Sequence, residues 1–136
     1  NPMNMVFCGD TLFSCGCGRI FEGTPQQLYE SLQKLSQLPD DTLIYCTHEY
    51  TLSNIRFART VDTENPKLIE LEITAQTLCN QNIPTIPTTL ALEKAVNPFL
   101  RCNQQAIANS VRNYSAQSLL DPLSVFTVLR EWKNNF

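Results

Sequence analysis

Residues 24–46, TPQQLYESLQKLSQLPDDTLIYC, decide the expected fold because they contain a complete signal for a helix followed by a strand. Thr24 can cap a helix, Pro25 suits its first turn, and Gln27 has the spacing of a capping box. Four leucines then recur at helical intervals, which predicts an apolar stripe lying on a sheet. They are Leu28, Leu32, Leu35 and Leu38. The final run, TLIYC, has the length and the bulky residues of a strand.

Two further segments of strand character precede this helix. MVFCGDTLF, residues 5–13, is an apolar run broken at Gly9 and Asp10, and GRIF covers residues 18–21. With TLIYC they give three strand candidates, and the helix lies between the last two. The local order is therefore strand, helix, strand, and we expect an α/β (α+β) fold over residues 1–50.

From Thr51 onward the sequence predicts helices and loops. TLSNIRFARTV has helical apolar spacing, and NPKLIELEITAQTLCNQ opens with Asn65 as a cap and Pro66 behind it. NIPTIPTTL, residues 82–90, is expected to be an extended connector because proline removes an amide donor and restricts the residue before it. We therefore expect residues 51–136 to consist mainly of helices and loops.

The last helix repeats the opening of cap followed by proline, at Asp121 and Pro122. Its predicted buried stripe is Leu123, Phe126 and Leu129. Arg130 and Lys133 are three residues apart, which puts both cations on one face of the helix. This face is either a binding site for an anionic group or a solvated basic tail.

The composition limits the kinds of partner. The chain has 136 residues, 43% of them hydrophobic, and a formal net charge of −3. This acidic balance argues against a broad surface for nucleic acid or anionic lipid, and no apolar run approaches the roughly 18 residues of a membrane-spanning helix. We therefore expect a cytoplasmic protein with no nucleic-acid partner and no membrane partner.

The six cysteines allow more than one interpretation. They are Cys8, Cys15, Cys17, Cys46, Cys79 and Cys102. They could pair in a secreted protein, but a chain of this length does not need disulfide staples, so we expect free thiols. In SCGCGR one residue separates Cys15 from Cys17, whereas structural zinc sites space their cysteines by about two to four residues. We favour a turn of small residues over a metal site.

Two residues lie where functional side chains collect in layered α/β folds. Asp10 follows a strand candidate, and His48, the only histidine, follows TLIYC directly. At strand ends, such side chains can form a catalytic pair or ligate zinc, iron or manganese. Two ligands alone do not hold a catalytic metal, and a lone histidine more often has a structural role, so the residues themselves leave these interpretations open.

Five motifs, in order along the chain, carry a resemblance to a known family. They are GDTLF (9–13), GCGRIFEGT (16–24), HEYTLSN (48–54), NPFLR (97–101) and LREWK (129–133). In this order they resemble the C-terminal half of glyoxalase II, the hydroxyacylglutathione hydrolases. The resemblance implies the C-terminal part of a metallo-β-lactamase αββα sandwich over residues 1–50 and a helical glutathione-binding domain over 51–136. It also implies hydrolysis of S-D-lactoylglutathione to D-lactate and glutathione.

The same resemblance implies a metal site with two divalent ions, which would be zinc, iron or manganese. Asp10 matches the carboxylate that bridges the two ions, His48 matches a terminal ligand, and both would act in catalysis through the metal-bound hydroxide. The family's remaining ligands come from a T-x-H-x-H-x-D-H motif and one further histidine, which this chain lacks. We therefore expect an inactive fragment whose partner is the missing N-terminal half or a second copy of itself.

The implied substrate is a glutathione thioester, and its two carboxylates need cations and hydrogen-bond donors. By resemblance the substrate-binding residues are Arg19, Phe21, Tyr50, Arg130 and Lys133. Phe21 departs from the family, because many members have tyrosine there, so this side chain can contribute only packing.

Two alternatives to a glyoxalase II remain. One is a persulfide dioxygenase with the same fold and a single iron, although that family lacks FEGT, HEYTLSN and the helical domain. The other is a helical binding module without catalytic activity.

Overall fold

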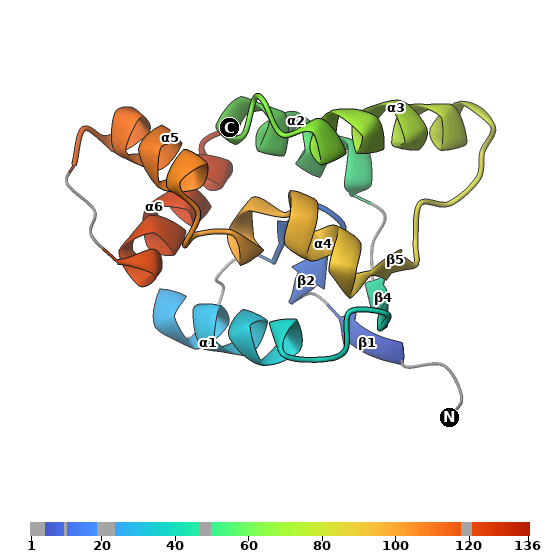
Figure 1. Cartoon of the computed structure of the whole chain (residues 1–136), viewed down its shortest axis with the longest axis horizontal. Helices are drawn as coiled ribbons and strands as arrows, with labels where there is room; N and C mark the ends of the chain where they lie inside the picture. Colours follow the sequence, from blue (N-terminus) through green and yellow to red (C-terminus); the bar gives the residue numbers. More distant parts are fainter. Residues whose placement is uncertain (1–4, 10, 19–23, 47–49, 118–120) are drawn as a thin grey trace.

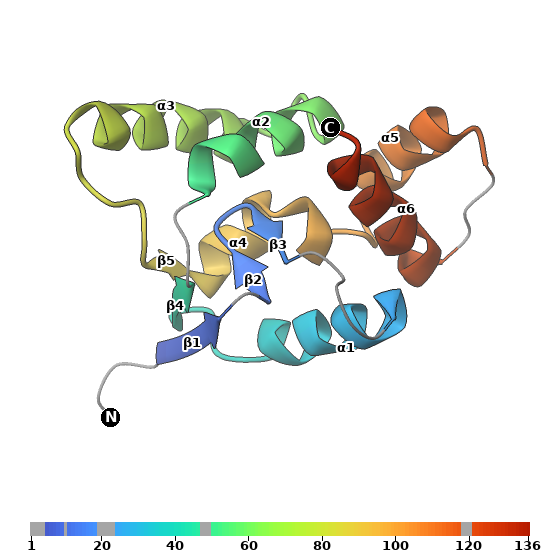
Figure 2. The same cartoon turned by 180° about the vertical axis from the view of Figure 1, so that it is seen from behind.

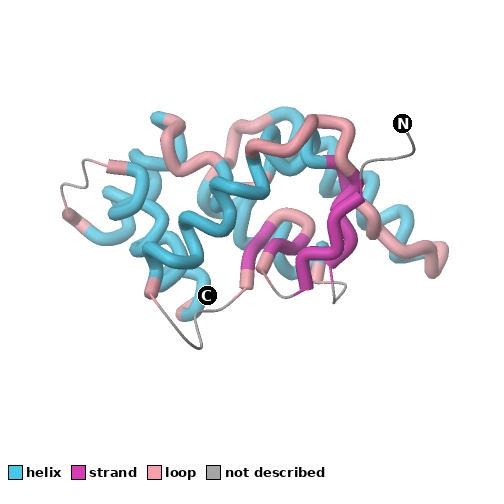
Figure 3. Tube along the Cα trace, turned by 90° about the horizontal axis from the view of Figure 1, so that it is seen from below, coloured by secondary structure: helices cyan, strands magenta, loops and turns pink. Residues whose placement is uncertain are grey.

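The computed structural model of the chain describes residues 5–9, 11–18, 24–46, 50–117 and 121–136, with the backbone alone for residues 6–9 and 46. Helices make up most of this part of the chain, and the strands gather in one region of the molecule (Figures 1 and 3). None of the described helices is long and apolar enough to cross a membrane.

A three-stranded sheet has the order β1-β4-β5. Strands β1 (Met5–Gly9) and β4 (Leu43–Cys46) are parallel, with Val6 opposite Ile44, and β5 (Thr88–Thr89) is antiparallel to β4. A parallel pair needs a crossover, and helix α1 (Pro25–Ser36) provides it. The strand predicted at TLIYC is confirmed, and the end of the predicted connector joins the same sheet as β5.

A short hairpin forms the second sheet and lies among the helices (Figure 2). Strand β2 (Leu12–Phe13) pairs antiparallel with β3 (Gly16–Cys17), and Ser14 and Cys15 make the turn. Cys15 has a φ of 64°, a left-handed conformation that residues other than glycine seldom adopt. We call residues 12–17 the hairpin. The strand predicted at GRIF lies mostly outside the described residues.

The remaining elements are helical, and their local signals explain where they begin. They are α2 (Thr51–Val61), α3 (Pro66–Asn80), α4 (Leu90–Val96), the 3-10 helix η1 (Pro98–Leu100), α5 (Gln105–Ser115) and α6 (Pro122–Asn134). The predicted caps are confirmed: Thr24 and Gln27 form a reciprocal capping box, Asn65 accepts a hydrogen bond at the start of α3, and Asp121 does so at the start of α6.

The main core joins the sheet to the C-terminal helices. Leu32 of α1, Ile44 of β4 and Phe126 of α6 are all fully buried in it. The apolar stripe of α1 therefore packs against helices as well as against a strand, whereas the sequence predicted only a sheet beneath it. Each such side chain contributes roughly 1.5–3 kcal/mol to stability through its removal from water.

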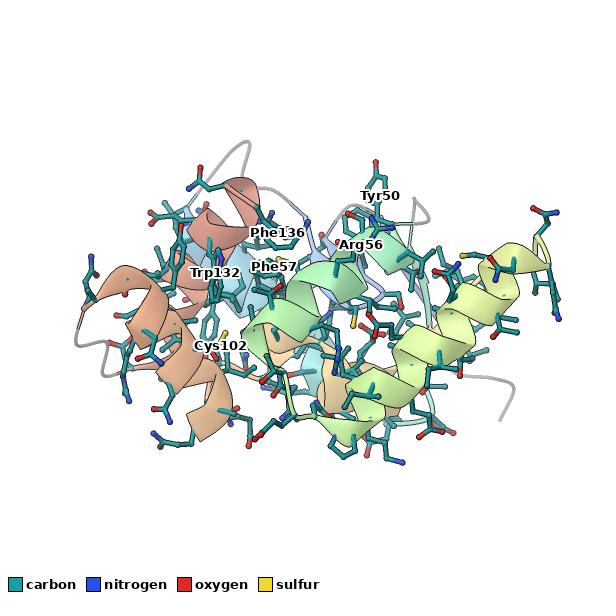
Figure 4. The ribbon with its side chains drawn as sticks, turned by 90° about the horizontal axis from the view of Figure 1, so that it is seen from above. Tyr50, Arg56, Phe57, Cys102, Trp132 and Phe136 are labelled. Carbon is teal, nitrogen blue, oxygen red and sulfur yellow. The ribbon has the colours of Figure 1, made fainter. Side chains whose placement is uncertain are left out.

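Aromatic rings dominate the part of the core where α6 meets α2 and α5. We call Phe57, Phe99, Phe126, Tyr114, Trp132 and Phe136 the aromatic cluster. Its ring contacts include a stacked pair, Tyr114 on Trp132, with centroids 4.5 Å apart, and the edge-to-face contact of Phe57 with Trp132 at 5.5 Å. Figure 4 shows Phe57, Trp132 and Phe136 grouped at this junction.

The fold class is thus mixed and rich in helix, with two small sheets in the described residues. The αββα sandwich that the family resemblance implies is not seen in this part of the chain. The boundary between residues 50 and 51 stays a prediction, and β5, which follows it in sequence, pairs with β4, which precedes it.

Candidate functional site

The hairpin is held through its backbone by polar side chains that come from the helices. Asn54 of α2 donates from Nδ2 to the carbonyl of Ser14, at 3.1 Å. Asn97, which follows α4, donates from Nδ2 to the carbonyls of Phe13 and Gly16, at 3.2 and 2.9 Å. Both asparagines are buried, so these carbonyls obtain from the protein the hydrogen bonds that water would otherwise supply.

Glu93 of α4 holds the turn itself. Its side chain is fully buried, and Oε1 accepts hydrogen bonds from the backbone N–H of Cys15, at 2.8 Å, and from Asn97 Nδ2, at 3.0 Å. Oε2 accepts from the hydroxyls of Thr88 and Ser14, at 2.9 and 3.5 Å. Burial raises the pKa of the Glu93 carboxyl, and these hydrogen bonds offset part of the rise.

Arg130 of α6 holds the end of the hairpin. Its side chain is 3% exposed, and Nη1 donates to the carbonyls of Cys17 and Gly18, at 2.8 and 3.2 Å. Nη2 donates to Asn134 Oδ1 at 3.1 Å, and the guanidinium carbon lies 5.4 Å from the centre of the Phe99 ring. Arg130 therefore does not belong to a solvated basic tail. We call Asn54, Glu93, Asn97 and Arg130 the polar cradle.

Two other predicted site residues lie at the edge of this region. Lys133 Nζ lies 5.8 Å from the centre of the Phe57 ring, and that ring stacks on Phe99 with centroids 6.1 Å apart. The two cations of α6 thus lie over neighbouring rings. Tyr50, just before α2, contacts the Phe13 ring edge-on at 5.2 Å and is 49% exposed. Figure 4 shows its side chain projecting from the start of that helix.

The cysteines of the hairpin are buried free thiols. Burial raises the pKa of Cys17 to about 11, although the neighbouring Arg130 acts in the opposite direction. Burial also raises the pKa of Cys15 well above its ordinary value. Both side chains are consequently neutral near pH 7 and pack as small apolar groups. The described residues contain no cluster of three or more histidine, cysteine, aspartate or glutamate side chains that could hold a metal ion.

Comparison with known proteins identifies the family. Residues 49–136 match the family model for the hydroxyacylglutathione hydrolase C-terminus. The chain belongs to the hydroxyacylglutathione hydrolase family. Proteins named hydroxyacylglutathione hydrolase from Nitrosomonas europaea and Shewanella halifaxensis are 62% and 53% identical to it, over 98% and 96% of the chain. A further relative, hydroxyacylglutathione hydrolase 2 of Vibrio vulnificus, is 56% identical. The chain spans about half the length of these relatives, 51% in each case.

Four residues predicted for the site of a hydroxyacylglutathione hydrolase lie outside the described residues. They are Asp10 and His48, assigned to metal and catalysis, and Arg19 and Phe21, assigned to substrate. Their roles stay predictions. In the sequence, Gly18 directly precedes Arg19, and Tyr50 follows His48 by two positions.

Sequence reasoning missed three members of the polar cradle. Asn54 and Asn97 stand in HEYTLSN and NPFLR, two motifs that identify the hydroxyacylglutathione hydrolase family, so the resemblance pointed to these segments but gave the asparagines no role. No signal marks Glu93, because a glutamate in LALEKAV is ordinary for an exposed helix. Its burial depends on the hairpin, whose Cys15 is 78 residues distant in sequence.

Proposed function

We propose that this chain is the C-terminal half of a thioester hydrolase that converts S-D-lactoylglutathione and water to D-lactate and glutathione. The observation that carries the proposal is the family match over residues 49–136, together with relatives of that name that are up to 62% identical over nearly all of the chain. The complete protein would be cytoplasmic, and the N-terminal half would be the partner of the segment described here.

Two divalent metal ions, zinc, iron or manganese, are part of this proposal. Asp10 would bridge them, because a carboxylate has two oxygens that reach different ions, and His48 would bind one of them through an imidazole nitrogen. When bound, such ions lower the pKa of water and polarise a carbonyl. The remaining ligands would come from the N-terminal half, so this chain alone would have little activity.

The residues of the chain itself would bind and orient glutathione. Lys133 and Tyr50 would meet the substrate directly, with an ammonium for a carboxylate and a phenol as a hydrogen-bond donor. Arg19 would add a second cation, and Phe21 would pack beside it. The Arg130 guanidinium is engaged with backbone carbonyls in this structure, so we assign it to hold the segment that leads into Arg19.

The test uses the complete protein that carries this chain, purified with each candidate metal. We expect hydrolysis of S-D-lactoylglutathione that is lost when the metal is removed with a chelator and restored when it is added back. Asp10→Asn should abolish both turnover and stoichiometric metal binding, and Asp40→Asn, at an exposed aspartate, should change neither. An intact mass of the source protein reports whether the N-terminal half is present.

Two outcomes would overturn the proposal. The first is a complete, metal-loaded protein that leaves glutathione thioesters intact while consuming oxygen with glutathione persulfide, which would indicate a dioxygenase. The second is undiminished thioester hydrolysis by the isolated 136-residue chain, because Asp10 and His48 alone leave both metals without enough ligands.

A further inference from the structure

The carboxylate of Glu93 is buried in an unusual setting. Its side chain is fully buried, and no lysine or arginine of the described chain forms an ion pair with it. A buried carboxylate without a cation is costly unless several donors meet it. Here the donors are the backbone N–H of Cys15, the amide of Asn97 and the hydroxyls of Thr88 and Ser14. In this arrangement a fully buried carboxylate serves to hold the conformation of one turn.

We propose that Glu93 is a positioning residue for substrate binding: it fixes the Ser14–Cys15 turn, and through it the neighbouring Phe13, whose ring contacts Tyr50 of the proposed substrate site. This inference rests on the proposed function. Glu93 does not touch the substrate, and it acts through the backbone of the hairpin.

The conformation of Cys15 explains why the turn needs this support. Its φ of 64° is left-handed, and a residue with a Cβ is disfavoured there. That conformation directs the Cys15 N–H to Glu93 Oε1, at 2.8 Å, which compensates for the strain. Without the acceptor, the turn would relax and the buried N–H would lose its only described partner.

The rest of the polar cradle gives the turn a fixed frame. Asn97 bonds the carbonyls of Phe13 and Gly16 on either side of the turn, and its Oδ1 accepts from the N–H of Phe99 at 3.0 Å. Its orientation is therefore determined, and it presents an N–H to Glu93 Oε1. Arg130 fixes the next two carbonyls along the strand, so a shift of the turn would displace Phe13 on the opposite strand and its contact with Tyr50.

The two oxygens of Glu93 have different requirements. Oε1 meets two groups that can only donate, the Cys15 N–H and the Asn97 amide, whereas Oε2 meets two hydroxyls, which can donate or accept. Glutamine can satisfy both sides if its oxygen takes the place of Oε1 and its NH2 donates to the hydroxyls. Leucine can satisfy neither side. Glu93→Gln and Glu93→Leu therefore separate hydrogen-bond acceptance from mere filling of the space.

The experiment measures the kinetics of the complete protein with S-D-lactoylglutathione. Glu93→Leu should raise KM about ten-fold or more with kcat changed less than about three-fold, and Glu93→Gln should keep KM within about two-fold of the wild type. The matched control is Leu90→Ala, a fully buried position on the same helix that makes none of these hydrogen bonds. It should lower the melting temperature and leave KM unchanged, which shows that destabilising α4 does not by itself weaken binding.

The inference is overturned if Leu90→Ala raises KM as much as Glu93→Leu, if Glu93→Leu lowers kcat alone, or if Glu93→Gln behaves like Glu93→Leu. A wild-type protein without thioesterase activity would overturn the proposed function instead. In that case the hydrogen-exchange rate of the Cys15 amide tests whether Glu93 fixes the turn. Protection lost in Glu93→Leu and kept in both Glu93→Gln and Leu90→Ala supports the positioning role, and equal protection in all three overturns it.

Discussion

The hairpin and the aromatic cluster both hold α6 against the rest of the chain, but they use different forces. At the hairpin, Arg130 donates hydrogen bonds to the carbonyls of Cys17 and Gly18, and hydrogen bonds are sensitive to distance and angle. In the aromatic cluster, Phe126 contacts Phe99 with ring centroids 6.0 Å apart, and it also contacts Tyr29 of α1, outside the cluster, at 5.5 Å. Burial of apolar area has little directional requirement. The cluster therefore supplies stability, and the hairpin contacts set geometry. Substitutions in the two regions should separate these two properties.

The largest effect is expected in the aromatic cluster. Phe126 is fully buried, and Phe126→Ala should lower the free energy of unfolding by about 3–5 kcal/mol, because it leaves a cavity where two rings met. Urea denaturation of the complete protein measures this change. Phe136→Ala is the control, since that ring is 60% exposed and should cost much less. Equal losses at the two positions would show that burial of the ring is not what gives the cluster its stabilising effect.

The next effect is expected at Arg130, where the two regions meet. Arg130→Met preserves most of the packing on Phe99 but leaves the Cys17 and Gly18 carbonyls without their donor. We expect a loss of about 1–3 kcal/mol and a rise in KM for the glutathione thioester. Arg130→Lys keeps the charge but not the planar fork of donors. Its stability should therefore be closer to the wild-type value than its KM is. A normal KM for Arg130→Met would contradict the view that this contact sets geometry.

An effect of similar size on stability, without an expected change in KM, comes from the close approach of the hairpin to α2. A Cβ added at Gly16 would lie 2.7 Å from both Cγ and Nδ2 of Asn54, so this amide must move away. Gly16→Ala should cost about 1–3 kcal/mol through overpacking. In the Asn54→Ala background the clash is absent, and the added cost of Gly16→Ala should fall to about zero, which a double-mutant cycle measures. If the effects of the two substitutions were strictly additive, the strain of Gly16→Ala would not come from its contact with Asn54.

The smallest effect on stability, and a clear effect on binding, is expected at Lys133. Lys133→Ala should raise KM for the glutathione thioester about ten-fold and change the free energy of unfolding by less than about 1 kcal/mol, since it removes the charge-assisted hydrogen bond that we propose between Lys133 and the substrate. Lys94→Ala is a matched control, because the Lys94 side chain forms an exposed ion pair with Asp40. An unchanged KM for Lys133→Ala would remove this residue from the proposed site.

The parts of the fold that the sequence predicted correctly depend on neighbours in the chain. The caps at Thr24, Asn65 and Asp121 each bond an N–H two or three residues away, so their signals are visible within a few letters. The placement of Arg130 and Lys133 on one face of α6 was also predicted from their spacing, whereas their role in substrate binding stays a prediction from the family resemblance. The burial of Arg130 was not predicted, because its partners Cys17 and Gly18 are more than a hundred residues away.

The polar cradle could not be predicted for the same reason. Nothing in the sequence distinguishes Glu93 from the exposed glutamates of other helices until the hairpin is placed beside it. Four predicted site residues lie outside the described part of the chain, so the metal site rests on the family resemblance alone.

The distance along the chain between the hairpin and its supports has a consequence for synthesis. Glu93 follows Cys15 by 78 residues, and Arg130 follows Cys17 by 113. At the roughly 5–20 residues per second of a ribosome, the hairpin waits on the order of 4–16 seconds before Glu93 is made, and longer before Arg130 is made. During this interval water must satisfy its carbonyls. The hairpin is therefore translated well before the side chains that hold it, and a ribosome that stalls before α6 leaves it without the Arg130 contact.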